Sequence, residues 1–355
     1  MIQIKEKISI RNVLGSPNRR LGGIELLRIV AMLLVMVVHA DFFSIGGPLW
    51  DDIKMNPLNA FTRIFIQSIS IVCVNTFVMI SGWFGIRPTV NKLLGLLFQI
   101  LFFFGGIYLC MVLLGYETLS LKGIAQVFML LPQSWFVKAY ILLFLISPVL
   151  NAFCENASRK EFLIVLIPFF AFQTLYGWLV PGCNFFSGGY STMSFIGLYL
   201  LMQYVRKHGG KLLEIKSRLN LTTFLALALL ETIVYILAVK YMPSRSSMMY
   251  CYVNPIIIAS SLFFFLTFYR LNIQSAFVNW TASSSFAVYL VHASPFILIP
   301  FYKPLVLFLY NRYDGIVCLG ILFVIMLVVF IASVLIDKVR LILWQKTVSL
   351  LKVNK

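Results

Sequence analysis

Residues 22–43 read GGIELLRIVAMLLVMVVHADFF, and this stretch decides how the rest of the chain is interpreted. A membrane-spanning helix needs about 20 mostly apolar residues, and this run supplies them while also carrying Glu25, Arg28 and His39. At about 100° and about 1.5 Å per residue, the step from Arg28 to His39 is three turns plus about 20°, with a rise of about 16 Å. We therefore expect Arg28 and His39 on one helical face at different depths, with Glu25 beside Arg28.

This polar face predicts a site inside the protein. A charged group near the bilayer centre costs at least about 2.5 kcal/mol, so such groups usually face a protein interior or a water-filled cavity. Another interpretation is an ion pair between Glu25 and Arg28 at the headgroup level, with His39 simply ending the helix. The spacing fits both interpretations.

The composition predicts an all-α, polytopic membrane protein. The chain is 61% hydrophobic and 12% charged, whereas about 25% charge is usual in soluble domains. We expect a basic arm (1–21), one membrane domain (22–340) and a basic tail (341–355). About ten apolar runs predict the spans: 22–43, 61–83, 91–114, 134–153, 161–180, 190–205, 220–240, 250–270, 281–302 and 314–337.

The net charge of +17 does not indicate nucleic acid, because the basic residues are divided among short connections instead of gathering on one soluble face. With ten spans, 20 of the 29 Lys and Arg residues fall on the side of the termini and 8 on the other side. This distribution predicts that both termini are cytoplasmic. We expect a multi-pass protein of a bacterial-type cytoplasmic membrane, with the lipid bilayer as its surroundings.

Residues 75–88 predict a basic cluster at the cytoplasmic end of the second span. Gly82 and Gly85 allow close helix approach, and Pro88 ends the helix. The cluster suits a phosphorylated ligand, although the bias of cytoplasmic loops towards positive charge would produce a similar pattern. Its members are Arg19, Arg20, Arg28, Arg87 and Lys92, with Ser81 nearby.

Two later spans carry polar groups. Trp135 and Lys138 lie at the beginning of the fourth span. Trp135 also fits the aromatic belt at the membrane surface, and Lys138 either extends outward to that surface or lines a polar cavity near the outer face. In the ninth span, Ser285, Tyr289 and His292 stand at i, i+4 and i+7, on one helical face. Hydrogen bonding between helices is the simpler explanation of that face, and a polar site is the other.

The chain has none of the motifs of metal, nucleotide or serine-hydrolase chemistry. There is no HExxH, no Walker loop, no GxGxxG after a strand, and no nucleophile elbow. We expect no metal and no permanently bound cofactor. A histidine in a polar site is then the best candidate for acid–base work near neutral pH.

At these residues the chain resembles the acyltransferase 3 family of integral-membrane enzymes, which O-acylate surface polysaccharides. The resemblance rests on Glu25-Leu-Leu-Arg28 followed by His39, on Ser81-Gly-Trp-Phe84, and on Trp135-Phe136 with Pro148. It also rests on Ser285-Phe-Ala-Val-Tyr289-Leu-Val-His292. The chain departs from the family where many members carry two arginines spaced RxxR, because Arg87 is followed by Pro-Thr-Val and then Lys92.

The resemblance implies an O-acetyltransferase that uses a cytoplasmic acyl-CoA, usually acetyl-CoA, and a sugar hydroxyl of a polysaccharide or its lipid-linked precursor. It implies catalytic roles for His39 and Arg28, which Glu25 would assist, and donor binding by the basic cluster with Ser81. Trp135, Lys138, Tyr289 and His292 are expected to hold the acceptor or polarise the oxyanion. His39 acts as a general base or forms an acyl-histidine. The competing hypotheses are a transporter or flippase of a lipid-linked sugar, and a polysaccharide polymerase.

Overall fold

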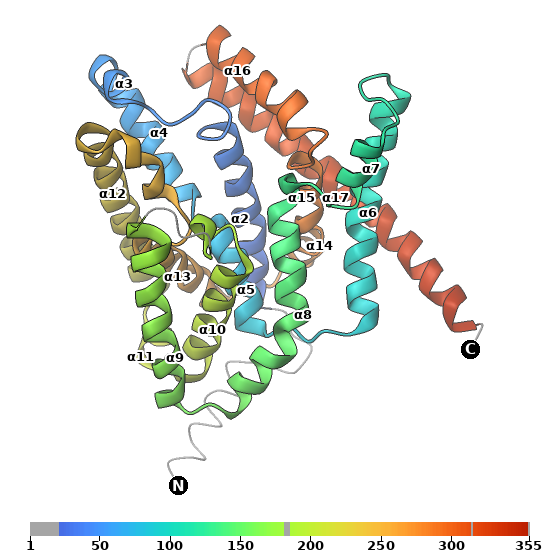
Figure 1. Ribbon diagram of the computed structural model, residues 1–355, viewed down its shortest axis with the longest axis horizontal. Coiled ribbons are helices and arrows are strands. Elements are labelled where there is room, and N and C mark those ends of the chain that lie inside the picture. The colour runs from blue at the N-terminus through green and yellow to red at the C-terminus, as the bar shows by residue number, and fades with distance from the viewer. Residues whose placement is uncertain (1–20, 181–184, 314, 354–355) are drawn as a thin grey trace.

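The computed structural model describes residues 21–180, 185–313 and 315–353, and this part of the chain forms helices without any strand (Figure 1). The 3₁₀ helices η1 (Pro132–Ser134), η3 (Ser187–Gly189) and η4 (Pro243–Tyr250) and the π-helices η2 (Gln173–Leu179) and η5 (Leu298–Tyr302) join or extend the α-helices. The α-helices are α2 (Gly22–Ala40), α3 (Trp50–Met55), α4 (Pro57–Ser70), α5 (Cys73–Phe84), α6 (Val90–Leu113), α7 (Leu121–Val127), α8 (Trp135–Asn156), α9 (Arg159–Phe172), α10 (Thr192–His208), α11 (Lys211–Glu214), α12 (Ser217–Tyr241), α13 (Pro255–Tyr269), α14 (Ala276–Ala282), α15 (Ser285–His292), α16 (Lys303–Arg312) and α17 (Gly315–Val353).

Local sequence sets many of the helix starts. Asn56 accepts a hydrogen bond from the Asn59 amide at 3.2 Å, and Pro57 occupies the first turn of α4. At the start of α9, Ser158 and Glu161 form a reciprocal capping box. These side chains satisfy amides that have no partner within their own helix, so each helix begins at a defined residue.

Eight helical stretches of the described residues have the length and composition to cross a membrane, which confirms a polytopic helical membrane protein. The eight stretches are Gly22–Ala40, Pro57–Phe84, Val90–Leu113, Leu121–Asn156, Arg159–Leu179, Ser217–Tyr241, Pro243–Tyr269 and Gly315–Thr347. The predicted run 190–205 is not among them; it corresponds to α10, which has 17 residues.

The predicted ninth run, 281–302, is not a single helix. The chain forms α14, starts again as α15 after Ser283 and Ser284, and leaves the helix before Pro295. Proline has no amide hydrogen and disfavours helical geometry in the residue before it, which explains the second break. As a result, α15 begins inside the bundle, at Ser285, and no side chain caps its first turn.

Helix α2 lies in the middle of the molecule (Figure 1) and packs against α4, α5, α13, α14 and α15. Its first residues lie close to the end of α13: a Cβ atom at Gly23 would collide with the Phe268 carbonyl oxygen. Glycine therefore allows this approach. Helix α2 therefore holds its polar side chains, Arg28 and His39, in fixed positions inside the bundle.

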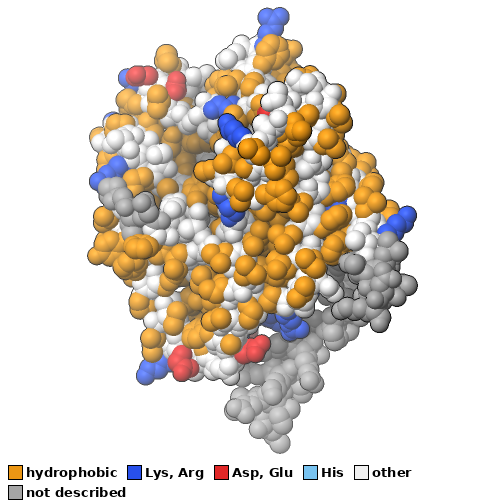
Figure 2. Space-filling view, turned by 45° about the vertical axis from the view of Figure 1, so that its right-hand side comes forward, with side chains coloured by type: hydrophobic (Ala, Val, Ile, Leu, Met, Phe, Trp, Pro, Cys, Tyr) orange, Lys and Arg blue, Asp and Glu red, His pale blue; other side chains and the backbone are white. Residues whose placement is uncertain are grey.

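The outer surface is apolar. Hydrophobic side chains cover most of the face in Figure 2, with acidic side chains near its upper and lower ends. On α17, Val324 and Val328 are each 59% exposed. Such a surface suits hydrocarbon. Helix α17 continues without interruption across the expected boundary at residue 341.

Candidate functional site

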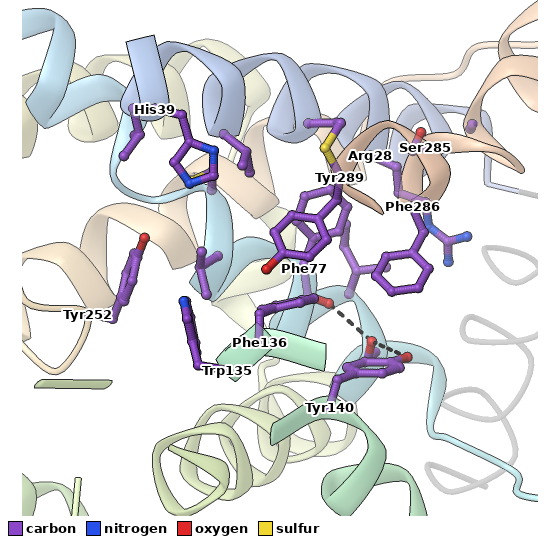
Figure 3. Close-up of a pocket in the computed structure, with 18 of the residues that line it drawn as sticks. Arg28, His39, Phe77, Trp135, Phe136, Tyr140, Tyr252, Ser285, Phe286 and Tyr289 are labelled. Carbon is purple, nitrogen blue, oxygen red and sulfur yellow. Dashed lines mark hydrogen bonds between the residues drawn. The ribbon is translucent and has the colours of Figure 1, made fainter. Parts of the chain in front are cut away.

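A cavity of about 280 Å³ lies along α2, and both Arg28 and His39 line it, as their helical spacing predicts. Figure 3 shows the two side chains on the same helix, towards opposite ends of the cavity. The other walls come from α5, α6, α8, α14, α15, the turn between α14 and α15, and the segment before α13. Besides these two residues the lining comprises Met32, Val35, Val38, Cys73, Val74, Phe77, Ile80, Ser81, Leu96, Trp135, Phe136, Tyr140, Tyr252, Ala282, Ser283, Ser285, Phe286 and Tyr289.

A histidine pair forms one end of the cavity. The Nδ1 atom of His39 lies 3.1 Å from Nε2 of His292, and Nδ1 of His292 lies 2.6 Å from the Val288 carbonyl oxygen. A carbonyl oxygen only accepts hydrogen bonds, so Nδ1 of His292 carries a proton and donates it. In the neutral ring, Nε2 of His292 then accepts from Nδ1–H of His39. This network leaves Nε2 of His39 unprotonated, as the basic nitrogen of the pair.

Arg28 lies at the other end, with Glu25 beside it and outside the lining. Nη1 of Arg28 lies 3.7 Å from Oε2 of Glu25, which is beyond hydrogen-bond distance. The Arg28 side chain is 33% exposed, and its guanidinium carbon lies 5.7 Å from the centre of the Phe84 ring. The guanidinium therefore lies near a carboxyl group and an aromatic ring, and its exposed part can still bind an anion.

Aromatic rings make up much of the wall between the two ends. Trp135 and Tyr252 stack with ring centres 6.2 Å apart, and Figure 3 shows both near His39. Tyr140 lies further along, where its hydroxyl is 3.2 Å from the Ser81 hydroxyl. Apolar walls with a few polar groups are typical of sites that bind small molecules.

The remaining predicted residues take other positions. His292 sits behind His39, and Tyr289, Trp135 and Ser81 line the cavity. The predicted residues Glu25, Arg87, Lys92 and Lys138 lie outside the lining. Lys138 donates to the Leu131 carbonyl at 2.8 Å, and Lys92 donates to the Arg87 carbonyl at 2.9 Å. Arg19 and Arg20 lie outside the described residues. Within residues 21–180, 185–313 and 315–353, no group of three or more His, Cys, Asp or Glu side chains could hold a metal ion.

Sequence reasoning missed two features. Tyr252 reaches the cavity from the irregular segment before α13, which carries no motif. The spacing of Ser285, Tyr289 and His292 indicated a polar face on α15, and the partner of that face, His39, is visible only after folding. Helical periodicity shows which face is polar and leaves open what the face contacts.

Two other ionisable groups lie away from the cavity. Glu231 is 1% exposed and accepts hydrogen bonds from the Asn254 amide at 3.1 and 3.2 Å. His208 is the last residue of α10, where burial and the charges of Lys207 and Arg159 lower its pKa. We interpret both as structural.

Comparison with known proteins gives one family. A family model described as an acyltransferase domain matches residues 21–337, which is nearly the whole chain. No curated protein and no solved structure matches the chain.

Proposed function

The chain belongs to the acyltransferase domain family, and we propose that it moves an acetyl group from a cytoplasmic acetyl-CoA to a hydroxyl of a sugar acceptor at the outer face. The observation that carries this proposal is that Arg28 and His39 line one cavity, where the contacts of His292 assign Nε2 of His39 as the basic nitrogen. The donor has the same polarity, with phosphates at one end and a thioester at the other. Family membership also favours an enzyme over a transporter.

Arg28, at one end of the cavity, is the residue next to which the donor phosphates would bind. A guanidinium forms strong, charge-assisted hydrogen bonds with phosphate oxygens. Arg87 and Lys92 follow α5 and begin α6, on the side of the molecule where α2 starts (Figure 1). The charge of the loops predicts that this side is cytoplasmic, where acyl-CoA is made.

The His39 end supports general-base catalysis. Nε2 of His39 would take the proton of the sugar hydroxyl while that oxygen attacks the thioester carbonyl carbon. The carbon–sulfur bond then breaks, and His39 returns the proton to the departing thiolate. His292 would stabilise the transient imidazolium through the hydrogen bond from Nδ1 of His39, because that bond becomes charge-assisted.

The aromatic wall near His39 supports a sugar as the acceptor. Trp135 and Tyr252 offer ring faces on which the apolar side of a sugar ring can pack, next to the basic nitrogen. Tyr289 brings a hydroxyl to the same cavity. This arrangement would orient a hydroxyl towards His39 and limit the entry of water, which would otherwise hydrolyse the thioester.

Purified protein in liposomes tests the proposal. Labelled acetyl-CoA and a panel of sugar acceptors are added, and both thiol release and label transfer to sugar are measured. His39→Gln should abolish the transfer that the native protein performs. His208→Gln is the matched control, because it changes a histidine outside the cavity and should leave transfer intact. Full transfer by His39→Gln, or sugar transport that needs no acetyl-CoA, would contradict the proposal.

A further inference from the structure

The turn between α14 and α15 gathers buried hydroxyl groups that have no hydrogen-bond partner. Among the described residues, Thr281 Oγ1, Ser284 Oγ and Ser285 Oγ all lack one, and their side chains are at most 8% exposed. Buried polar groups in folded proteins are nearly always paired with protein, water or ligand. Of the three, Ser285 also lines the cavity, so its hydroxyl is placed to pair with a bound polar ligand.

Part of this turn opens into the cavity. Ser283 and Ser285 line it together with Arg28, and Figure 3 shows Arg28, Ser285 and Phe286 close together at one end. Ser285 is the first residue of α15, and no side chain caps this helix start. The first amides of a helix have no partner within it, and the helix dipole makes them attract anions. Ser285 thus adds a buried hydroxyl to an anion-attracting helix start.

A second cation reaches the turn from α17. Nζ of Lys338 lies 2.9 Å from Oγ of Ser283 and 4.5 Å from the centre of the Trp280 ring, and it donates to the Trp280 carbonyl at 2.6 Å. Arg28 comes from α2, near the other end of the chain. The turn therefore lies beside cations from two helices, which would balance the two charges of a diphosphate.

We propose, on the basis of the function proposed above, that the α14–α15 turn binds the diphosphate of the acyl-CoA donor. Ser285 Oγ and the first amides of α15 donate to phosphate oxygens, and Arg28 and Lys338 neutralise their charge. Ser285 precedes His292 by seven residues, so the phosphate site is about 10 Å from the histidine pair along the helix axis. This separation places the phosphates away from the reacting carbonyl and leaves the flexible thiol arm to reach His39.

The test compares CoA with pantetheine, which has the same thiol arm and no phosphate. Binding of each to the purified protein is measured by calorimetry for the native chain, Ser285→Ala and Lys338→Gln. We expect each variant to bind CoA about tenfold more weakly, because each loses a hydrogen bond or ion pair to a charged group, and to bind pantetheine unchanged.

The controls are Ser333→Ala and Lys160→Gln. Ser333 is a buried serine whose hydroxyl already donates to the Val329 carbonyl at 2.7 Å, and Lys160 is an exposed lysine at the start of α9. Both should bind CoA like the native chain. Thermal unfolding of every variant identifies any that fails to fold. If Ser285→Ala does not fold, Lys338→Gln still tests the proposal.

Equal CoA affinity in the native chain and both variants would overturn the proposal. An equal loss of CoA and pantetheine binding would also overturn it, because the turn would then contact the thiol arm. A native chain that binds no CoA would overturn the proposed function itself, which separates the two failures.

Discussion

Nδ1 of His39 and Nε2 of His292 lie 3.1 Å apart, although 253 residues separate the two histidines in the chain. The contact joins the end of α2 to the end of α15. Because the Val288 carbonyl only accepts hydrogen bonds, donation runs from Nδ1–H of His39 to Nε2 of His292, and from Nδ1–H of His292 to the Val288 oxygen. Under the proposed function, His39 is then the histidine that reacts, and His292 is the one that positions it.

Replacing His292 should lower the catalytic rate while leaving donor binding intact. In His292→Leu, His39 loses the partner that fixes its tautomer and stabilises its charge. We expect kcat to fall by about 10–100-fold, as for other partners that orient a functional histidine. The measurement is steady-state transfer with CoA affinity in parallel. A variant with native kcat would show that His292 only fills space.

Replacing Arg28 should weaken the donor interaction more than the chemical step. Arg28→Gln loses a charge-assisted contact worth about 1.5–3 kcal/mol, so we expect the KM for acetyl-CoA to rise by at least about tenfold. Arg218→Gln removes a cation from an exposed position at the start of α12 and is the control. If both variants raised the KM for acetyl-CoA equally, the overall positive charge of the protein would explain the effect, and the position of Arg28 in the cavity would not.

Replacing Trp135 should affect the acceptor side of the reaction. Trp135→Ala removes a ring of the cavity wall that is proposed to pack against the sugar, and a ring contact of this kind is worth about 0.5–1.5 kcal/mol. We expect the KM for the sugar to rise about three- to tenfold, with the KM for acetyl-CoA unchanged. Trp50→Ala, at the start of α3 and outside the cavity lining, serves as the control. A rise in the donor KM instead would assign Trp135 to the thioester arm.

Adding a methyl group at Gly82 should destabilise the bundle. A Cβ atom there would lie 2.8 Å from the Tyr199 carbonyl oxygen and 2.9 Å from its Cα, at the contact between α5 and α10. Overpacking of this kind costs about 1–3 kcal/mol. Thermal unfolding in detergent should show a lower Tm for Gly82→Ala than for Gly106→Ala, because a Cβ at Gly106 meets no atom within 4 Å. Equal Tm values would mean that α5 and α10 can move apart without cost.

The features that the sequence predicted well depend on local periodicity. The eleven-residue step from Arg28 to His39 follows from helix geometry, and both side chains line one cavity. The close approach expected at Gly82 is also present, because glycine permits it wherever two helices meet. The roles of these residues in donor binding and catalysis stay predictions.

The features that the sequence did not predict depend on contacts between distant segments. Residues 281–302 looked like one apolar helix, since hydropathy alone does not show that a helix starts again at Ser285. Nothing near Tyr252 indicates that it reaches the cavity, and nothing near His292 indicates its partner. Contacts between distant segments decide these positions: Asn75 of α5 donates to the Tyr252 carbonyl at 2.9 Å, and His292 meets His39 of α2.

The shared cavity of Arg28 and His39 has a consequence for cell energetics. Under the proposed function, CoA enters and leaves on one side, and only the two-carbon unit passes to the other. The proton released by the sugar ends on the sulfur, so the cycle separates no net charge. Modification of the cell exterior would then draw on the thioester bond alone, and it would continue in a membrane whose voltage and ion gradients have collapsed.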